Sequence, residues 1–370
     1  MTEKMMTRLA PVLALALVAG APALAENSNL RAALSVLPDT VFSGLTPDVA
    51  RYVDLTALAE AHDGTLGREA LARALMGGGI RPVEAIAVGT AEGFGEKAGV
   101  DASALAFVAG MGQPPEAVSI WGLADETAAT TAFASLSERG FEELPSGMIA
   151  NGEPGVMNLA GRDPADPWRG TMGQPSVVAR SGLTLLQADD AAVLEPLLAD
   201  GPSALDTPAG KTILAGLEAQ EGAVLQVAFL GPWHGLSGRI DPTVLAGKTP
   251  EEARTALEEA AAASPVGLPL WQSAALADVE TPEGPTLILA LAYADCPEAQ
   301  AAAERAAELW RGMDGADGDL AAASTAPPTP SGCAAVLHVA SLDGTPGPFN
   351  RASHALITGN LPALRIGSGG

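Results

Sequence analysis

Two stretches of the chain, "SIWGLADETAATTAFASLSERGF" (119–141) and "LILALAYADCPEAQAAAERAAELW" (287–310), share one plan. Each has an apolar run typical of a strand, then an aspartate, then an alanine-rich helix whose apolar residues recur every three or four positions. Asp125 and Asp295 stand where an N-cap residue would accept hydrogen bonds from the first helical turn. Because these aspartates lie 170 residues apart in a chain of 370, the pattern predicts one structural unit built twice.

The segments around these helices also match. Residues 104–123 and 273–294 each contain two apolar runs separated by a proline-containing turn, which is typical of a β-hairpin. "PSVVARSGLTLLQ" (175–187) and "SHALITGNLPALRIG" (353–367) are expected to close each half with a further hairpin. The sequence therefore predicts an α+β fold of two similar halves, each an antiparallel or mixed sheet of β-hairpins with helices packed on one face. The alternative is chance similarity between alanine-rich segments.

The N-terminus is expected to be a signal peptide, residues 1–25. Lys4 and Arg8 precede a short apolar stretch, and Ala23-Leu24-Ala25 has the small-x-small pattern of a cleavage site. We expect cleavage to leave a soluble chain that is periplasmic or secreted. We expect no stable membrane insertion after cleavage, because no later apolar run approaches the ~20 residues of a membrane span.

Two α+β units are expected after the signal peptide, residues 26–200 and residues 201–366, with the second a duplicate of the first. Residues 313–332 are rich in proline, alanine, glycine and threonine, and we expect them to form a mobile loop. The tail, residues 367–370, is expected to be disordered.

Charge and cysteine content narrow the class of protein. The chain has 44 acidic residues against 20 lysines and arginines, a formal net charge of −24. Such a surface repels phosphate backbones, so we exclude nucleic acid as a partner.

Two cysteines, Cys296 and Cys333, form an even set, and in an exported protein this favours a disulfide. Two buried thiols are the alternative.

Sequence motifs that carry chemistry are missing from the chain. It has no Gly-x-Ser-x-Gly, Ser-x-x-Lys, phosphate-loop or dinucleotide-binding pattern. The four histidines lack the spacings of a zinc site, and the acidic stretch beginning at Asp314 does not match a calcium loop. We therefore assign no catalytic residue, metal or cofactor, and favour a protein that is not an enzyme. Ser353, His354, Asp343 and Ser341 lie close together in sequence and include the residue types of a nucleophilic set, but such a set is recognised by its geometry, which sequence alone does not give.

Tryptophans in loop-like places are the most suggestive pattern. "DPWRG" (166–170) and "GPWHG" (231–235) both read Pro-Trp-basic-Gly, and "LPLWQS" (268–273) adds a third tryptophan near a proline. Exposed tryptophan and arginine are enriched where proteins bind partners. The alternative is that each tryptophan caps a sheet core with its indole N–H in water. The candidate contact residues are Trp168, Arg169, Trp233, His234 and Trp271.

The sequence favours an exported, soluble, non-catalytic protein of the bacterial envelope that mediates protein–protein interaction or assembly. The alternative is a periplasmic binding module for a small or apolar ligand held between the two halves, which predicts an apolar pocket at their junction. A hydrolase whose site is assembled only in three dimensions is the third hypothesis. The sequence leaves the partner, the ligand and the oligomeric state open.

Overall fold

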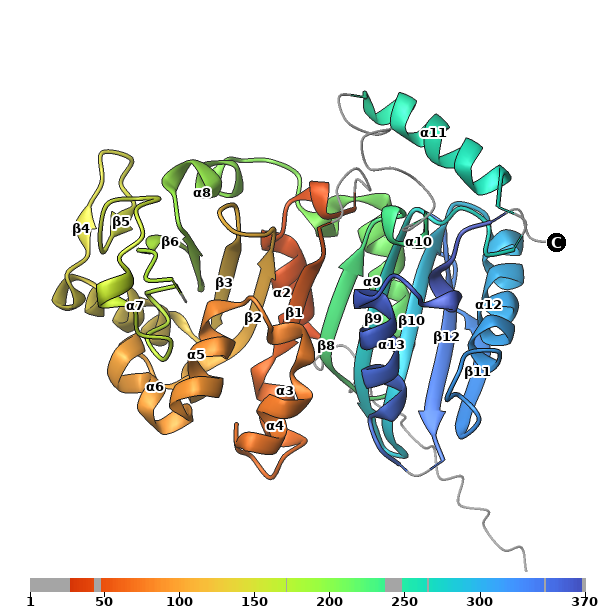
Figure 1. The fold of residues 1–370 in the computed structure, drawn as a ribbon, viewed down its shortest axis with the longest axis horizontal. Helices are drawn as coiled ribbons and strands as arrows, with labels where there is room; N and C mark the ends of the chain where they lie inside the picture. Colours follow the sequence, from red (N-terminus) through yellow and green to blue (C-terminus); the bar gives the residue numbers. More distant parts are fainter. Residues whose placement is uncertain are drawn as a thin grey trace, which may run out of the picture.

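The computed structural model describes residues 27–42, 48–170, 172–236, 248–264, 266–342 and 344–367. The expected signal peptide and the last three residues of the expected tail lie outside these ranges. The described chain is α+β, as predicted, with a single antiparallel sheet of twelve strands in the order β11-β12-β10-β9-β8-β1-β2-β3-β7-β6-β5-β4 (Figure 1). The two halves therefore share one continuous sheet.

The halves meet at the centre of the sheet, where β1 (Ala50–Asp54) pairs with β8 (Ala223–Leu230) and Arg51 lies opposite Ala228. The strand order outward from this pair is the same on both sides, because β1-β2-β3-β7-β6 corresponds to β8-β9-β10-β12-β11. The first half continues with β2 (Leu105–Met111), β3 (Val118–Leu123), β7 (Thr184–Ala188), β6 (Val177–Ser181), β5 (Ile149–Ala150) and β4 (Glu142–Glu143). The second half continues with β9 (Ser273–Thr281), β10 (Gly284–Tyr293), β12 (Cys333–Ser341) and β11 (Asp319–Thr325).

Helices cover both faces of the sheet, so the prediction of helices on one face was wrong. Alternate residues of a strand enter different cores, as Val53 and Tyr52 do, and both cores need cover because the central strands are apolar on each side. One face packs against α2 (Ser28–Val36), α8 (Ala191–Leu198) and α9 (Pro208–Glu218). The other packs against α3 (Leu55–Glu60), α4 (Arg68–Arg73), α5 (Arg81–Gly89), α6 (Ala91–Ala98), α7 (Glu126–Ser135), α10 (Trp233–Leu236), α11 (Pro250–Ala262), α12 (Cys296–Arg311) and α13 (Gly347–Ile357).

The helices α7 and α12 begin directly after the aspartates that were predicted to cap them. The Asp125 carboxylate accepts a hydrogen bond from Ala128 N at 2.8 Å, at the start of α7. The Asp295 carboxylate accepts one from Glu298 N at 3.0 Å, at the start of α12. Each aspartate satisfies an amide that the helix itself leaves without a partner.

The closing hairpins differ from the prediction in the second half. Residues 175–187 contain the predicted hairpin, β6–β7. Residues 353–367, predicted as its counterpart, instead contain the end of α13 and a short 3-10 turn. The corresponding hairpin is β11–β12, and β11 lies inside 313–332, which was expected to be a loop. The strand was missed because "DLAAAST" is alanine-rich and has little β-branched or aromatic character.

The predicted disulfide between Cys296 and Cys333 is confirmed. It joins the first residue of α12 to the first residue of β12, with their Cα atoms 5.1 Å apart. The bridge therefore fixes the start of the helix against the strand that precedes α13. In the described residues, no helix is long and apolar enough to cross a bilayer.

Candidate functional site

The tryptophans that were predicted to contact a partner lie in the core. Trp168 stacks on Trp121 with ring centroids 4.3 Å apart, and its Nε1 donates a hydrogen bond to Ala98 O at 3.0 Å. Trp271 is buried and its Nε1 donates to Leu364 O at 3.0 Å. These two indole N–H groups therefore bind backbone carbonyls rather than water. A direct contact with a partner would require these side chains to leave the core.

The other candidate contact residues lie in different places. Trp233 is also buried. Arg169 is partly exposed and lies 3.8 Å from the carboxylate of Asp166. His234 lines a groove where the two halves meet, and it is the only one of the five candidates that lines any of the three grooves described next. The structure therefore does not gather the five residues into one surface.

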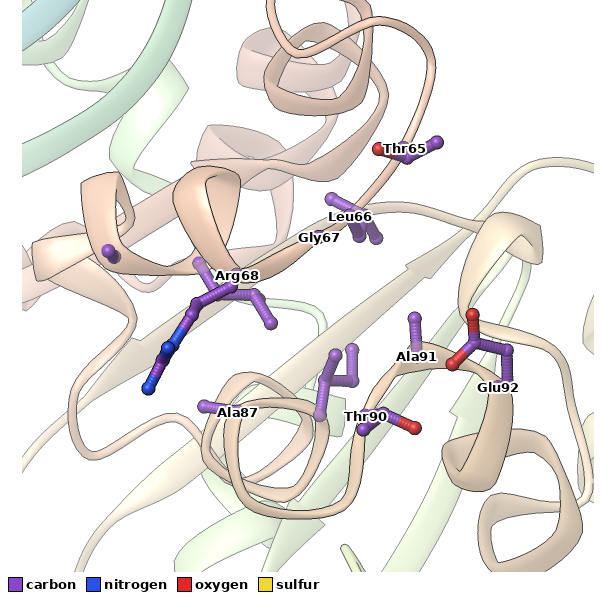
Figure 2. A pocket seen from close by; sticks show the side chains of 11 residues that line it. Thr65, Leu66, Gly67, Arg68, Ala87, Thr90, Ala91 and Glu92 are labelled. Atoms are coloured by element: carbon purple, nitrogen blue, oxygen red, sulfur yellow. The ribbon is translucent and has the colours of Figure 1, made fainter.

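The largest of these grooves, of about 700 Å³, lies within the first half, between α4, α5 and α6 (Figure 2). Most of its lining residues are apolar, and Figure 2 shows Arg68 and Glu92 on opposite sides of it. Thr90, at the start of α6, has a φ of 67°, which is unusual for a β-branched residue. With one charge of each sign, this groove shows no preference for a cation or an anion.

A second groove, of about 680 Å³, lies beside α3, the end of α9, the start of β8 and the end of β9. It is acidic, and two of its carboxylates already pair with arginines, Glu218 with Arg31 and Glu280 with Arg73. Within the described residues, no group of three or more histidine, cysteine, aspartate or glutamate side chains could hold a metal ion.

The third groove, of about 510 Å³, lies where the two halves meet, and we call it the junction groove. Two large apolar side chains at this groove are unusually exposed, Leu75 at 44% and Ile357 at 82%. None of the described residues that line it is acidic. The lining residues are Val49, Arg51, Leu75, Met76 and Gly78 from the first half, and His234, Leu356, Ile357 and Gly359 from the second.

One wall of the junction groove is the glycine-rich connection between α4 and α5. Polar side chains of the sheet hold its backbone in place. Met76 N donates to Gln226 Oε1 at 2.9 Å, and Gln226 Nε2 donates to Arg73 O at 2.6 Å. A side chain at Gly77 would collide with Val83, so the close packing here requires glycine. The fixed backbone leaves Leu75 pointing outward.

A buried ion pair beneath this wall ties the halves together. Arg73, from α4, donates two hydrogen bonds of 2.8 Å to the carboxylate of Asp278 in β9, and a third of 2.5 Å to Glu280. Asp278 is fully buried. Burial lowers the pKa of Arg73, but hydrogen bonds and charge from Asp278 and Glu280 outweigh this effect and raise the pKa overall. The guanidinium is therefore held charged at the junction.

Arg51, in the central strand β1, is the charged side chain inside the junction groove. Its Nη1 donates to Gly78 O in the glycine-rich wall. Burial lowers the pKa of Arg51, and the nearby charge of Glu84 offsets part of this effect. Within the described residues, no carboxylate forms an ion pair with Arg51. The groove therefore contains a partly desolvated positive charge.

The opposite wall comes from the C-terminal part of the chain. The helix α13 ends at Ile357, and Gly359, with a φ of 68°, turns the chain away from the groove. The short helix α10, which carries His234, is fixed by a hydrogen bond from Ile366 N to Gly235 O at 2.9 Å. Segments roughly 280 residues apart in sequence thus face each other across the groove.

The described residues do not assemble the nucleophilic set considered from sequence. Ser353 is buried whereas its neighbour His354 is exposed, so they face different sides of α13, and Asp343 lies outside the described residues. A different pair is closer, because Ser324 Oγ and His338 Nε2 are 2.9 Å apart on β11 and β12. Burial lowers the pKa of His338. Among the described residues, no carboxylate hydrogen bonds to His338, and neither residue lines a groove described above.

No protein-family model, curated protein or solved structure matches the chain. The junction groove is thus identified from its geometry, and sequence reasoning missed most of its lining. One usable signal was Arg51, which interrupts the apolar run "VARYVDL". Another was "MGGGI" at 76–80, which the sequence alone indicates only as the end of a helix.

Proposed function

We propose that the chain is an exported, non-catalytic binding protein that holds an apolar ligand in the junction groove. The observation that carries this proposal is the groove itself, to which both halves contribute apolar side chains. Concave sites with mostly apolar walls and a few polar groups are typical of small-molecule binding sites. Covering Leu75 and Ile357 removes apolar surface from water, which favours binding.

The protein-partner hypothesis rests on the lack of a catalytic motif and on the repeated hairpin–helix plan, and it expected a surface patch around the loop tryptophans. Burial of Trp168, Trp233 and Trp271 in the core makes that patch less well supported. The hydrolase hypothesis is also less well supported, because Ser353 and His354 face different sides of their helix. The ligand-binding hypothesis, in contrast, predicted an apolar pocket where the halves meet, and the junction groove fits that description.

The remaining parts of the proposal concern location and origin. A periplasmic or secreted location fits the predicted signal peptide, residues 1–25, and the Cys296–Cys333 disulfide, since disulfides persist mainly in oxidising compartments. We place the two units at 26–200 and 201–366 and regard them as copies of one unit. The shared strand order outward from β1 and β8 supports this duplication.

A binding experiment with a matched pair of variants tests the proposed function. The probe is a long-chain alcohol, which is apolar and uncharged, and binding is measured as displacement of an environment-sensitive fluorophore. Leu75→Glu places a charge in the junction groove, whereas Leu183→Glu places one at a similarly exposed leucine in the β6–β7 turn, 45% against 44% exposed. We expect Leu75→Glu to abolish binding and Leu183→Glu to preserve it. Equal binding by both variants would show the proposal to be wrong, and so would a wild type that binds no probe with a long apolar chain, whatever its head group.

A further inference from the structure

We infer that the ligand of the junction groove is an anionic amphiphile, a long acyl chain with one carboxylate, and that Arg51 binds its head group. This inference rests on the proposed function. It adds the chemical class of the ligand, the sign of its charge and the residue that recognises it.

The charges around the groove are the first argument. The chain carries more than twice as many acidic residues as lysines and arginines. The α4–α6 groove contains Glu92, and the groove beside α9 contains several glutamates. Among its described lining residues, the junction groove has Arg51 and His234 and no acid. On a strongly acidic protein, a basic apolar groove is locally complementary to an anion.

The hydrogen bonds of Arg51 are the second argument. Arg73 and Arg81, also largely buried, pair with Asp278 and Asp189 respectively. Arg51 instead donates to one backbone carbonyl, Gly78 O. A guanidinium has five N–H donors in a planar fork that matches a carboxylate. The described residues thus leave most of the Arg51 fork without a protein acceptor, beside the groove.

Desolvation of Arg51 is the third argument. Burial lowers the pKa of Arg51, and the only nearby acid that offsets this effect, Glu84, has an oxygen engaged by Gly79 N at 2.9 Å. A buried charge that has lost water is stabilised by an opposite charge that brings hydrogen bonds. A bound carboxylate would provide both.

The apolar lining fits an acyl chain. Val49, Leu75 and Met76 lie on one side of the groove, and Leu356 and Ile357 lie on the other. Methionine and leucine side chains adapt to a flexible chain more easily than β-branched ones do. At about 510 Å³, the groove has the size of an ordinary small-molecule site.

A ligand series tests the inference on the wild-type protein. Oleate, oleyl alcohol and oleylamine share one chain and differ in the charge of the head group. Each is titrated below its aggregation concentration, with fluorophore displacement as the readout. We expect oleate to bind about tenfold to hundredfold more tightly than the alcohol, as an added charged hydrogen bond permits, and the amine to bind most weakly. If alcohol and oleate bind equally, the inference is wrong while the proposed function stands. If none of the three binds, the proposed function fails as well.

Variants of Arg51 test the assignment of the head-group contact. Arg51→Met keeps an apolar stem without the charge and should remove the preference for oleate over the alcohol. Arg51→Lys keeps the charge without the fork and should keep part of the preference. Arg68→Met, in the α4–α6 groove, is the matched control and should bind like the wild type. If a folded Arg51→Met variant still prefers oleate, Arg51 does not bind the head group. If Arg51→Met does not fold, Arg51→Lys decides the assignment.

Discussion

The two halves of the sheet share one strand order but are held together by different means. In the second half, β9, β10 and β12 have nine, ten and nine residues, and a disulfide joins β12 to α12. In the first half, β2, β3 and β7 have seven, six and five residues. There the stacked Trp121 and Trp168 and the buried Arg81–Asp189 pair contribute side-chain contacts instead. The same strand order therefore carries longer strands and a disulfide in one half, and shorter strands with a stacked tryptophan pair and a buried ion pair in the other.

The insertions between strands at corresponding places in the sheet differ as well, and these unlike insertions contribute to the junction groove. The first half places α3 to α6 between β1 and β2, and their α4–α5 connection forms one wall. The second half places α10 and α11 between β8 and β9, and α10 adds His234 to the opposite wall. A strictly symmetric duplicate would present the same surface twice, whereas the described residues form the junction groove from unlike segments of the two halves.

The largest expected effect comes from breaking the link between the halves. Asp278→Ala leaves the buried Arg73 guanidinium without its main partner, and we expect a loss of about 3–5 kcal/mol in the free energy of unfolding. Urea titration followed by circular dichroism measures it. The control is Glu258→Ala, which removes the exposed partner of Arg254 and should cost at most about 1 kcal/mol. Similar small losses in both variants would show that the ion pair does not couple the halves.

Removing the disulfide should weaken the second half selectively. Replacing both Cys296 and Cys333 with serine should lower the free energy of unfolding of the bridged segment by about 2–4 kcal/mol, because that segment gains conformational freedom when it opens locally. Hydrogen exchange resolved by peptide would show where protection is lost. We expect the loss in α12 and β12, with β2 and β3 little changed. A uniform loss across the sheet would contradict a selective role.

The caps of α7 and α12 test how alike the halves are. Asp125→Ala and Asp295→Ala each remove one hydrogen bond of nearly equal length, 2.8 Å and 3.0 Å. Each should cost about 1 kcal/mol, as N-cap residues typically do. Thermal unfolding of the two variants, measured side by side, checks this expectation. A difference of more than about 1 kcal/mol between them would show that the two caps are not equivalent.

The smallest expected effect is a difference in how the halves respond to acid. Burial raises the pKa of Asp54 above 3.8, so its contribution to stability is full below that pH and is lost as the pH rises through the folded-state pKa. Burial lowers the pKa of His338 below 6.5, so its contribution is full above that pH and is lost as the pH falls. We expect Asp54→Asn and His338→Gln each to flatten one arm of the stability–pH curve. Curves parallel to that of the wild type would contradict these assignments.

Sequence periodicity predicted local features well. The caps Asp125 and Asp295, the β9–β10 hairpin and the disulfide depend on neighbouring residues or on compartment, and all are present. The cover on both faces was missed, although "VSIWGL" (118–123), which is buried throughout, carries the signal of a strand enclosed on each side. A strand that is apolar at every position indicates a sheet covered on both faces. A hairpin pattern alone does not show how many faces of the sheet are covered.

The sequence suggested an apolar pocket between the halves as one alternative, but most of the residues that line the junction groove could not be predicted from it. Leu75 and Ile357 read as ordinary apolar residues of helical segments, and they meet only because β1 pairs with β8. The tryptophans were expected to be exposed contact residues, but they are buried. A Pro-Trp-basic-Gly pattern does not distinguish an exposed anchor from a core residue such as Trp168, which stacks on Trp121. Exposure is set by long-range packing, and a local motif does not report it.

Photo-crosslinking tests the central claim most directly. A fatty acid with a photoreactive group near the end of its chain is bound to the full protein, irradiated, and located by peptide mass spectrometry. The proposed function and the inferred ligand together predict labels on the two walls of the junction groove, at residues 75–78 and 356–359. Labels confined to the α4–α6 groove, at residues 65–72 and 86–92, would place the ligand elsewhere and contradict the account.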